Sequence, residues 1–439
     1  MGFFCKMNLY PHQIQARDFL LSRKRAILAD APRVGKTMPA ASAAIQHLPA
    51  MVICPAVVKP GWVKAFAALG HQAQEIRGRA AAQAVKAEGV VVINYDLIMD
   101  MPCREGWATV IIDEVHRIKT PPGEKKVRDR ITKKWKTVKT GQRTEASIEI
   151  MHATPRVYAL SGTIPPNRPI EMWPLLHGLG IYKRSWLEFA FRYCKAWNPP
   201  WGGLDVSGAS NLPELRKKLK PHVLRRKREQ VFTGYQHPVV SMVELDLPND
   251  KREKAFDADA VAEAVSANPN AILAIEGLSE IMREGGERKA PLAADFIRAR
   301  IEQEPEDPLV VFAWHKSVVA MLSDSLKQDP PISHVVVTGE TSASAKQQAI
   351  EDFQAGKVQV IIGNISSISE GVDLSRANTV IFAESTWQTS ALEQASARVE
   401  NINKQGCAPL IYLLTIRASL DSIVLSKVLK KVGIIEQII

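Results

Sequence analysis

The stretches RAILADAPRVGKT, residues 25–37, and TVIIDEVH, residues 109–116, decide the fold expected for this chain. Each begins with an uninterrupted apolar run and ends in polar residues. Near-continuous runs of this kind are typical of parallel strands that are buried on both faces of a sheet. The two stretches therefore predict a parallel sheet that carries polar groups at its carboxyl edge.

Further apolar runs of the same kind extend this pattern over most of the chain. The spaces between them are long enough for crossover helices, which favours doubly wound sheets. Because the runs form an early and a late series, we predict an α/β fold of two tandem doubly wound parallel-sheet lobes, with helical insertions between and within them. The further runs are MVICPA (51–56), VVVINY (90–95), YALSGT (158–163), PLVVFAW (308–314), SHVVVTG (333–339), VQVIIGN (358–364), NTVIFAE (378–384) and PLIYLLT (409–415).

The expected lobes span residues 1–235 and 236–439, with turn-rich and helical segments between the two series of runs. In the first lobe we expect a basic insertion at about 117–150 and a helical extension at about 183–235. In the second lobe we expect a helical segment at about 250–300. The helical patterns are LPELRKKLKPHVLRRKREQV (212–231) and DADAVAEAVSANPNAILAIEGLSEIM (257–282).

The composition of the 439 residues, 46% apolar and 23% charged, is that of a globular protein and excludes disordered, collagen-like and disulfide-scaffold classes. Apolar runs fall far short of the roughly 20 residues that span a bilayer, so no membrane partner is expected. None of the five cysteines forms a CxxC pair, and we expect no zinc site. Reduced cysteines indicate a cytoplasmic location.

Positive charge is in excess, with a formal net charge of +11. A basic chain favours a polyanionic partner, although many basic proteins bind no nucleic acid. Between residues 117 and 143 stand eleven Lys or Arg against two acids. Such a run is often a solvated hairpin or loop, but here the phosphate-contacting interpretation is slightly favoured, because neutralised phosphates release condensed counterions.

The stretch 25–37 has the order strand, loop and helix, and the helix opens at Gly35-Lys36-Thr37. A glycine lets the loop close around a phosphate, the Lys36 ammonium attracts the β and γ phosphates, and the Thr37 hydroxyl can bind magnesium. Asp30 stands where the GxxxxGK[ST] pattern has its first glycine. The loop nevertheless predicts ATP and Mg²⁺ as cofactors.

Asp113 and Glu114 end another strand of the same series, which brings two carboxylates to the sheet edge beside the phosphate loop. We predict that Asp113 holds magnesium through water and that Glu114 polarises the attacking water. An isolated Asp-Glu pair after a strand is more often a helix cap. Its combination with GKT favours the catalytic interpretation.

With these elements in place, the sequence resembles the Swi/Snf-like ATPases of helicase superfamily two. DEVH is similar to their DEAH-type box, and other motifs follow in the family's order from about residue 9 to 425. The matching segments are LYPHQIQARDFL (9–20), ADAPRVGKT (29–37), CPAVVKPGWVKAFAAL (54–69), VVVINYDLI (90–98), ALSGTIPPNRPIEMWPLL (159–176), HVLRRKREQV (222–231), VVFAWHKSVVAMLSDSL (310–326), GETSASAKQQAIEDFQAG (339–356), IIGNISSISEGVDLSRANTVIFAESTW (361–387) and QASARVENINKQ (394–405).

The resemblance implies RecA-like lobes and assigns roles to residues at the matching positions. Gln13 would read the adenine edge, and Gln394 and Arg398 would act in catalysis when lobe two closes over ATP. The implied nucleotide-binding residues are Asp30, Arg33, Val34, Gly35, Lys36, Thr37, Gly371 and Asp373. The implied DNA contacts are Lys59, Trp62, Tyr95, Thr163, His315 and Asn364, to which the basic insertion adds Lys133, Lys134 and Lys136. For Trp62 and Tyr95, ordinary packing is an equal alternative.

Three departures from the family pattern concern its machinery. Ala31 and Arg33 replace the family's Glu and Gly in the phosphate loop. Asn401 stands where the family usually carries a second arginine of its last motif, and an arginine finger stabilises the transferring phosphoryl group. The gap between Asp113 and Gly162 is longer than usual, and the basic run fills it.

The resemblance implies an ATP-driven translocase on double-stranded DNA, hydrolysing ATP on DNA, with forks or branched DNA as a narrower expectation. A strand-separating helicase, an ATP-gated DNA-binding protein with weak hydrolysis, and an RNA-acting enzyme remain alternatives. We expect a monomer in the absence of DNA. Since accessory modules of chromatin remodellers are not recognised, a compact motor of a bacterium or of its virus, in the cytoplasm of the bacterial or virus-infected host cell, is expected.

Overall fold

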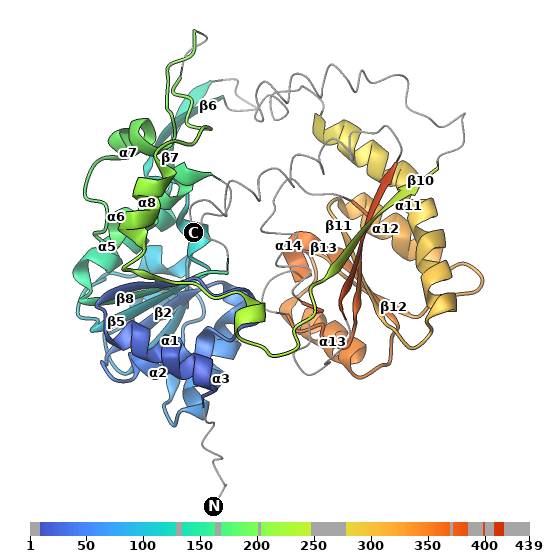
Figure 1. The fold of residues 1–439 in the computed structure, drawn as a ribbon, viewed down its shortest axis with the longest axis horizontal. Helices are drawn as coiled ribbons and strands as arrows, with labels where there is room; N and C mark the ends of the chain where they lie inside the picture. Colours follow the sequence, from blue (N-terminus) through green and yellow to red (C-terminus); the bar gives the residue numbers. More distant parts are fainter. Residues whose placement is uncertain are drawn as a thin grey trace, which may run out of the picture. The chain divides into compact units, whose positions relative to one another are not determined.

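The computed structural model describes residues 9–128, 134–162, 168–200, 203–246, 278–368, 372–384, 398–399 and 408–416. The chain divides between Val231 and Phe232 into two compact units, lobe one and lobe two (Figure 1). The sequence places this division at 235/236, a few residues further on. Each lobe is described by itself.

Lobe one is built on a parallel sheet of seven strands in the order β3-β4-β2-β5-β8-β1-β9. Because β8 alone separates β5 from β1, the carboxyl ends of the DEVH strand and of the phosphate-loop strand lie close together on one edge. The strands are β1 (Arg25–Leu28), β2 (Ala50–Cys54), β3 (Ala73–Glu75), β4 (Val90–Asn94), β5 (Thr109–Asp113), β8 (Arg156–Leu160) and β9 (Val223–Leu224).

Helices cover both faces of this sheet, and successive strand residues feed two separate cores. Along β1, Ile27 belongs to one apolar cluster while Ala26 and Leu28 belong to the other. The second cluster lies under α1 (Pro11–Leu21), α2 (Thr37–Ala44) and α3 (Lys59–Ala68). The first lies under the remaining helices, among them α4 (Arg79–Gln83), α5 (Gln142–Ala153), α6 (Trp173–Gly178), α7 (Trp186–Tyr193) and α8 (Leu212–Leu219).

Short 3₁₀ turns join several of these elements in lobe one. They are η1 (Ala56–Val58), η2 (Leu97–Asp100), η3 (Val115–Ile118), η4 (Pro169–Met172) and η5 (Arg228–Gln230). The last of them ends directly before the division between the lobes.

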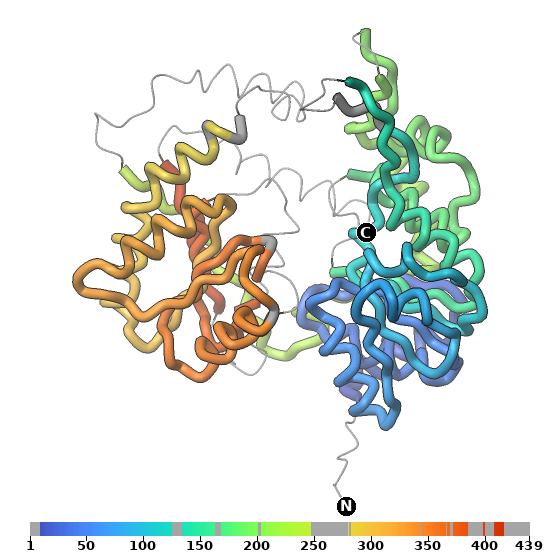
Figure 2. The backbone as a smooth tube through the Cα atoms, turned by 180° about the vertical axis from the view of Figure 1, so that it is seen from behind, coloured from blue at the N-terminus to red at the C-terminus, as the bar shows by residue number. Residues whose placement is uncertain are grey.

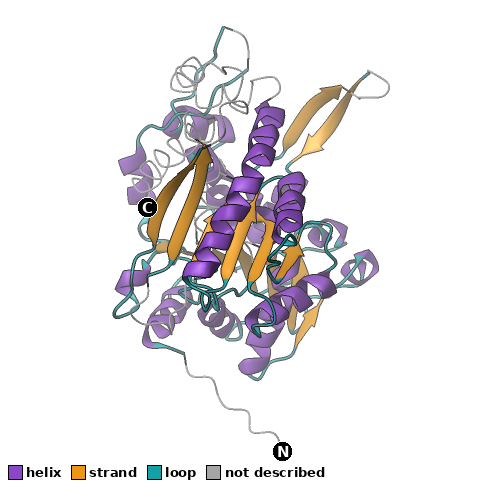
Figure 3. Ribbon diagram, turned by 90° about the vertical axis from the view of Figure 1, so that its right-hand side faces the viewer, coloured by secondary structure: helices purple, strands orange, loops and turns teal. Residues whose placement is uncertain are grey.

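The basic insertion forms an antiparallel hairpin of β6 (Gly123–Arg128) and β7 (Trp135–Thr140). Among the strands of the described residues, β6 and β7 pair only with each other, and the hairpin stands away from the parallel sheet of lobe one (Figure 3). At its base, Gly141 has a φ of +69°, and an added Cβ would meet the Pro121 carbonyl oxygen at 2.4 Å. Glycine is therefore needed where β7 turns into α5.

Lobe two is a parallel sheet of six strands in the order β10-β15-β14-β11-β13-β12. Helices α11 and α12 lie side by side (Figure 2), and Ala290, Ala294 and Val318 belong to one buried apolar cluster. The elements are β10 (Val239–Leu245), α11 (Leu278–Gln303), β11 (Leu309–Ala313), α12 (Lys316–Leu326), β12 (His334–Val337), α13 (Ala343–Gln354), β13 (Val360–Asn364), α14 (Ile365–Ile368), β14 (Thr379–Phe382) and β15 (Leu410–Ile416).

The predicted fold class, two doubly wound parallel-sheet lobes, is confirmed, and each predicted run contains a strand. One helical interpretation was wrong. The stretch 212–231 is helical only through Leu219, because Pro221 cannot continue a helix and Val223–Leu224 pair with β1 as an edge strand. The pattern at 257–282 lies outside the described residues up to Gly277. Among the described residues, no helix has both the length and the apolar content needed to cross a membrane.

Candidate nucleotide-binding site and nucleic-acid interface

The phosphate loop runs from the end of β1 to the first residue of α2. Its backbone takes the left-handed region at Arg33, with a φ of +68°, and at Gly35, with a φ of +88°. At Gly35 an added Cβ would lie 2.6 Å from the Gln13 amide nitrogen, so glycine is required there for space as well as for conformation. Arg33 occupies its position at a steric cost of about 1 kcal/mol.

Lys36 lies within this loop. Its Nζ donates to the backbone carbonyl oxygens of Asp30, at 2.8 Å, and of Ala31, at 3.3 Å. Burial lowers the pKa of Lys36, while the negative charges of Glu114 and Asp113 act in the opposite direction. Those interactions bring the two predicted halves of the site, the phosphate loop and the DEVH carboxylates, into one electrostatic environment.

Gln13 is buried against the loop. Its Nε2 donates to the carbonyl oxygen of Gly35 at 3.2 Å, and its Oε1 accepts from the Tyr10 backbone N–H at 3.1 Å. Both ends of its amide are thus bonded within the lobe in this structure. The contact of Gln13 with the adenine edge stays a prediction. Tyr10, which the sequence analysis did not single out, is 67% exposed and stacks on His12.

Asp30 does not face solvent and cannot contact a nucleotide directly. Its carboxylate is 1% exposed, accepts from the Arg226 backbone N–H at 3.0 Å, and forms a two-point ion pair with the Arg226 guanidinium. We therefore correct its predicted role: Asp30 shapes the loop from within the protein.

The DEVH carboxylates sit in a network of buried donors. Trp62 Nε1 donates to Asp113 Oδ2 at 2.8 Å, the Glu114 backbone N–H donates to Asp113 Oδ1 at 3.0 Å, and Tyr95 Oη donates to the Asp113 carbonyl oxygen at 2.6 Å. Burial raises the pKa of Asp113 to about 7, and the neighbouring Glu114 charge adds to the increase. Glu114 has a φ of +52°, and one of its oxygens lies 3.3 Å from His116 Nδ1.

This network changes the interpretation of three predicted DNA contacts. Trp62 and Tyr95 are 1% and 3% exposed, and their polar atoms serve the DEVH segment. Lys59 is 6% exposed, and its Nζ donates to the Ile76 carbonyl oxygen at 2.6 Å. Burial and internal bonds favour the packing alternative for Trp62 and Tyr95 and give Lys59 a partner within the lobe, so a DNA contact of these three side chains is not proposed further.

Thr37 is the first residue of α2, and Asp113 ends β5 at the same sheet edge. Their hydroxyl and carboxylate oxygens are the kind of donor that Mg²⁺ prefers. The residues present therefore fit the predicted metal.

The predicted contributors from lobe two are described only in part. The Leu374 backbone N–H donates to the Arg398 carbonyl oxygen at 3.3 Å, next to an exposed Asp373. His315 Nδ1 lies 2.7 Å from a carboxylate oxygen of Glu384, and Asn364 Nδ2 donates to the Trp314 carbonyl oxygen at 2.9 Å. The predicted residues outside the described ranges are Lys133, Thr163, Gly371 and Gln394.

The chain is similar to several known proteins. Residues 292–403 match the family model of the helicase conserved C-terminal domain. The SWI/SNF-related matrix-associated actin-dependent regulator of chromatin subfamily A-like protein 1 of Xenopus laevis is 28% identical over 447 residues, covering 98% of this chain. The DNA annealing helicase and endonuclease ZRANB3 of Homo sapiens is 23% identical over 445 residues, covering 95% of this chain.

These matches support the resemblance of the chain to the Swi/Snf-like ATPases of helicase superfamily two. It spans 44% of the Xenopus laevis relative and 39% of the human one, which is less than half the length of either. Among solved structures, the Sulfolobus solfataricus SWI2/SNF2 ATPase core in complex with dsDNA aligns over 99% of this chain and 93% of that chain, with 19% identity and a TM-score of 0.44.

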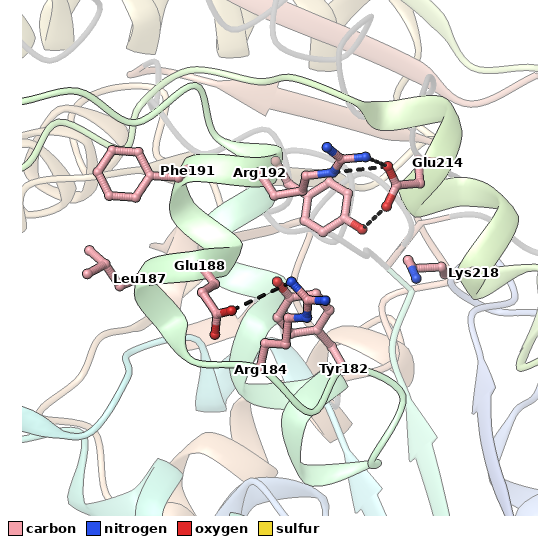
Figure 4. Close-up of a pocket in the computed structure, with 9 residues that line it drawn as sticks. Tyr182, Arg184, Leu187, Glu188, Phe191, Arg192, Glu214 and Lys218 are labelled. Atoms are coloured by element: carbon pink, nitrogen blue, oxygen red, sulfur yellow. Dashed lines mark hydrogen bonds and ion pairs between the residues drawn. The ribbon is translucent and has the colours of Figure 1, made fainter.

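Two further features of the chain, the basic hairpin and a pocket in lobe one, lie outside the family motifs. On the hairpin, Lys134, Lys136 and Lys139 are exposed, and Trp135 is 69% exposed. The second is a pocket of about 680 Å³ beside α7 and α8 (Figure 4). Its lining contains no residue of the phosphate loop or of DEVH. Within the lining, Arg192 Nε donates to a carboxylate oxygen of Glu214, and Tyr193 Oη donates to the other at 2.8 Å.

Proposed function

We propose that this chain is a DNA-dependent ATP hydrolase that uses ATP to translocate along double-stranded DNA. The observation that carries the proposal is the placement of the phosphate loop and the DEVH carboxylates at one sheet edge, after strands β1 and β5 that β8 alone separates. A phosphate-binding loop beside paired carboxylates is the arrangement that phosphoryl transfer requires. The names of the relatives, a chromatin regulator and a DNA annealing helicase, support DNA as the partner.

In the proposed reaction, water attacks the γ-phosphorus of ATP, and the bond to the β–γ bridging oxygen breaks to give ADP and phosphate. Glu114 polarises the water, and Lys36 exchanges its loop carbonyls for phosphate oxygens. Magnesium, when bound, neutralises phosphate charge. Trp62 and Tyr95 keep the DEVH segment in place through their bonds to Asp113.

Exposed lysines on the hairpin support phosphate-backbone binding by lobe one. Their contacts would be independent of base sequence, which suits a motor that moves along DNA. In lobe two, we propose His315 as part of the DNA face and Arg398 as the residue that acts on the γ-phosphate, on the strength of their family positions. Asn364, 6% exposed and bonded to the Trp314 carbonyl oxygen, is left out of this proposal for the same reason as Lys59.

The ATPase rate, measured without nucleic acid and with single-stranded DNA, duplex DNA, branched DNA and RNA, tests the proposal. We expect duplex or branched DNA to stimulate the rate most strongly. No stimulation by any DNA would contradict it. Displacement of a third strand from a triplex, without unwinding of a blunt duplex, would report translocation and would exclude the strand-separating alternative.

The second candidate is an ATP-gated DNA-binding protein with weak hydrolysis, which Asn401 in the last motif favours. ATP-dependent DNA affinity with negligible phosphate release would identify it. We further propose that the chain acts on forks or branched DNA, is a monomer without DNA, and works in a bacterial or virus-infected cytoplasm. The name of the annealing helicase supports the first, and the absence of CxxC pairs among five cysteines supports a reducing compartment.

A further inference from the structure

Most backbone carbonyl groups of the phosphate loop accept a hydrogen bond from a side chain. Lys36 takes those of Asp30 and Ala31, as described above. Three more carbonyls accept from side chains of two other segments: that of Pro32 from Arg228 Nε at 2.8 Å, that of Val34 from His12 Nε2 at 3.0 Å, and that of Gly35 from Gln13 Nε2 at 3.2 Å. Two loop N–H groups are bonded as well, that of Ala31 to the Arg226 carbonyl oxygen and that of Val34 to the Ala31 carbonyl oxygen at 3.3 Å. A backbone fixed in this way can present its other N–H groups to an anion.

One guanidinium joins the segments that form this frame. Arg226 Nε donates to Asp30 Oδ1 at 3.0 Å, and its two terminal nitrogens donate to Asp30 Oδ2 and, at 2.6 Å, to the His12 carbonyl oxygen. The side chains of Arg226 and Asp30 are 13% and 1% exposed. A planar guanidinium can make these three contacts at once, whereas a lysine ammonium lacks the fixed fork.

The backbone of the same segment adds to the frame. The Ala29 N–H donates to the Leu224 carbonyl oxygen at 2.7 Å, and the Ala31 N–H donates to that of Arg226 at 3.0 Å. The pairing of β1 with β9 thus continues beyond both strands into the first residues of the phosphate loop. Residues 223–228 also lie just before the division between the lobes, so the chain that leaves lobe one is part of the loop's support.

The sequence explains why such a frame is needed. The loop lacks the first glycine of the phosphate-loop pattern, where Asp30 stands, and it places Arg33 in the left-handed region. Contacts to fixed neighbours must therefore hold a conformation that glycines would otherwise adopt without strain. Asp30 contributes to these contacts because its carboxylate forms the ion pair with Arg226.

We infer that Arg226 and Arg228 are positioning residues of the nucleotide site, which hold the phosphate loop in its phosphate-receiving shape through Asp30 and Pro32. The inference rests on the proposed function, since it concerns ATP binding at that loop. Neither arginine touches the nucleotide in this account. Their loss weakens the binding of ATP and ADP while the chemistry at Glu114 proceeds once ATP is bound.

The test compares Arg226→Lys, Arg226→Gln, Arg228→Ala and the control Lys227→Ala in the full chain. The control removes an exposed cation from the same segment. The readouts are the affinity for fluorescently labelled ADP with Mg²⁺, the separate KM and kcat for ATP on duplex DNA, and thermal unfolding. We expect Arg226→Gln to weaken ADP binding and raise KM by about tenfold, with kcat within about threefold, and Arg228→Ala to raise KM by about two- to fivefold. Arg226→Lys should fall between wild type and Arg226→Gln, and Lys227→Ala should match wild type.

Coupling to Asp30 gives a second readout. Once Arg226 is Gln, Asp30→Asn should weaken ADP binding by much less than Asp30→Asn alone, because the two residues act as a pair. If Arg226→Gln fails to fold, since it strands a buried carboxylate, Arg226→Lys and Arg228→Ala decide the matter. Wild-type ADP affinity in both, or a loss of kcat with KM unchanged, would overturn the inference. A wild-type chain that binds no ADP would instead overturn the proposed function.

Discussion

At the scale of single residues, the structure places two aromatic side chains against the DEVH segment: Trp62 donates to the Asp113 carboxylate and Tyr95 to the Asp113 backbone carbonyl oxygen. Trp62 and Tyr95 were predicted to meet DNA or to pack, and they are buried with their polar atoms on Asp113. Sequence alone could not distinguish these roles, because an indole or phenol suits a buried hydrogen bond as well as an interface. Burial and the identity of the acceptor decide between them.

The most direct test of the site replaces its two central charges. Lys36→Ala removes the phosphate-binding ammonium, and Glu114→Gln removes the carboxylate that polarises water. We expect each variant to lose at least about 100-fold in ATP hydrolysis while its thermal unfolding stays near wild type. Glu114→Gln should still bind ATP. Turnover close to wild type in either purified variant would contradict the site assignment.

A second residue-scale prediction concerns the indole. Trp62→Phe removes the donor to Asp113 and leaves a buried carboxylate oxygen short of one bond, which should cost about 1–3 kcal/mol of unfolding free energy. We also expect slower ATP hydrolysis and a higher Mg²⁺ requirement. Trp173→Phe is the matched control, because Trp173 Nε1 donates at 3.1 Å to the carbonyl oxygen of Arg184, away from the DEVH segment. Equal loss of activity in both variants would refute a specific link to Asp113.

At the scale of elements, strong apolar runs predicted strands reliably and weak patterns did not. The strands that line both lobes come from long Val, Ile and Leu runs, since two buried faces demand them. The edge strands β3 and β9 are too short to show a period, and β10 alternates between half-buried and exposed residues. For Val223–Leu224 the flanking arginines suggested a helix, yet two of them, Arg226 and Arg228, bond to the phosphate loop.

In the candidate site, too, the sequence predicted some residues and missed the role of another. Lys36, Thr37, Asp113 and Glu114 could be predicted because their chemistry depends on residue type at the end of a strand. The role of Asp30 could not, because its partner Arg226 lies 196 residues away in sequence. Only the fold shows that pairing.

The hairpin is the element whose function is most readily tested. Changing Lys133, Lys134 and Lys136 together to Ala should weaken duplex binding and raise the DNA concentration for half-maximal ATPase, with basal hydrolysis unchanged. Each lost phosphate contact should reduce the slope of log affinity against log salt by about 0.9. Affinity measured across a salt series gives this slope.

A matched control variant distinguishes an effect of the hairpin's position from an effect of the net charge of lobe one. Lys217, Lys218 and Lys220 lie in and just after α8 and are exposed, so their replacement by Ala removes the same charge from lobe one. If it flattens the salt slope as much as the hairpin variant does, net charge explains the effect. If the hairpin variant keeps the wild-type slope and DNA requirement, those lysines are a solvated face.

At the scale of the whole molecule, the chain has two lobes of the same sheet class with unequal shares of the proposed chemistry. Lobe one carries the phosphate loop and DEVH, while lobe two carries the last motif with Arg398. In such a motor, hydrolysis depends on groups that arrive only when the lobes close. Asn401 in place of an arginine therefore concerns the rate of the complete molecule.

We predict that Asn401→Arg raises the DNA-stimulated ATPase rate, because a second guanidinium could then stabilise the charge on the transferring phosphoryl group. An arginine finger supplies about 10³–10⁵ in rate where it is the missing element, so even partial alignment should be measurable as a higher kcat with little change in KM. The competing account is that Arg398 alone, or Lys404, already fills the role. Under that account Asn401→Arg leaves kcat unchanged, and Arg398→Ala or Lys404→Ala eliminates it. The comparison of these three variants on the same duplex identifies which cation completes the site.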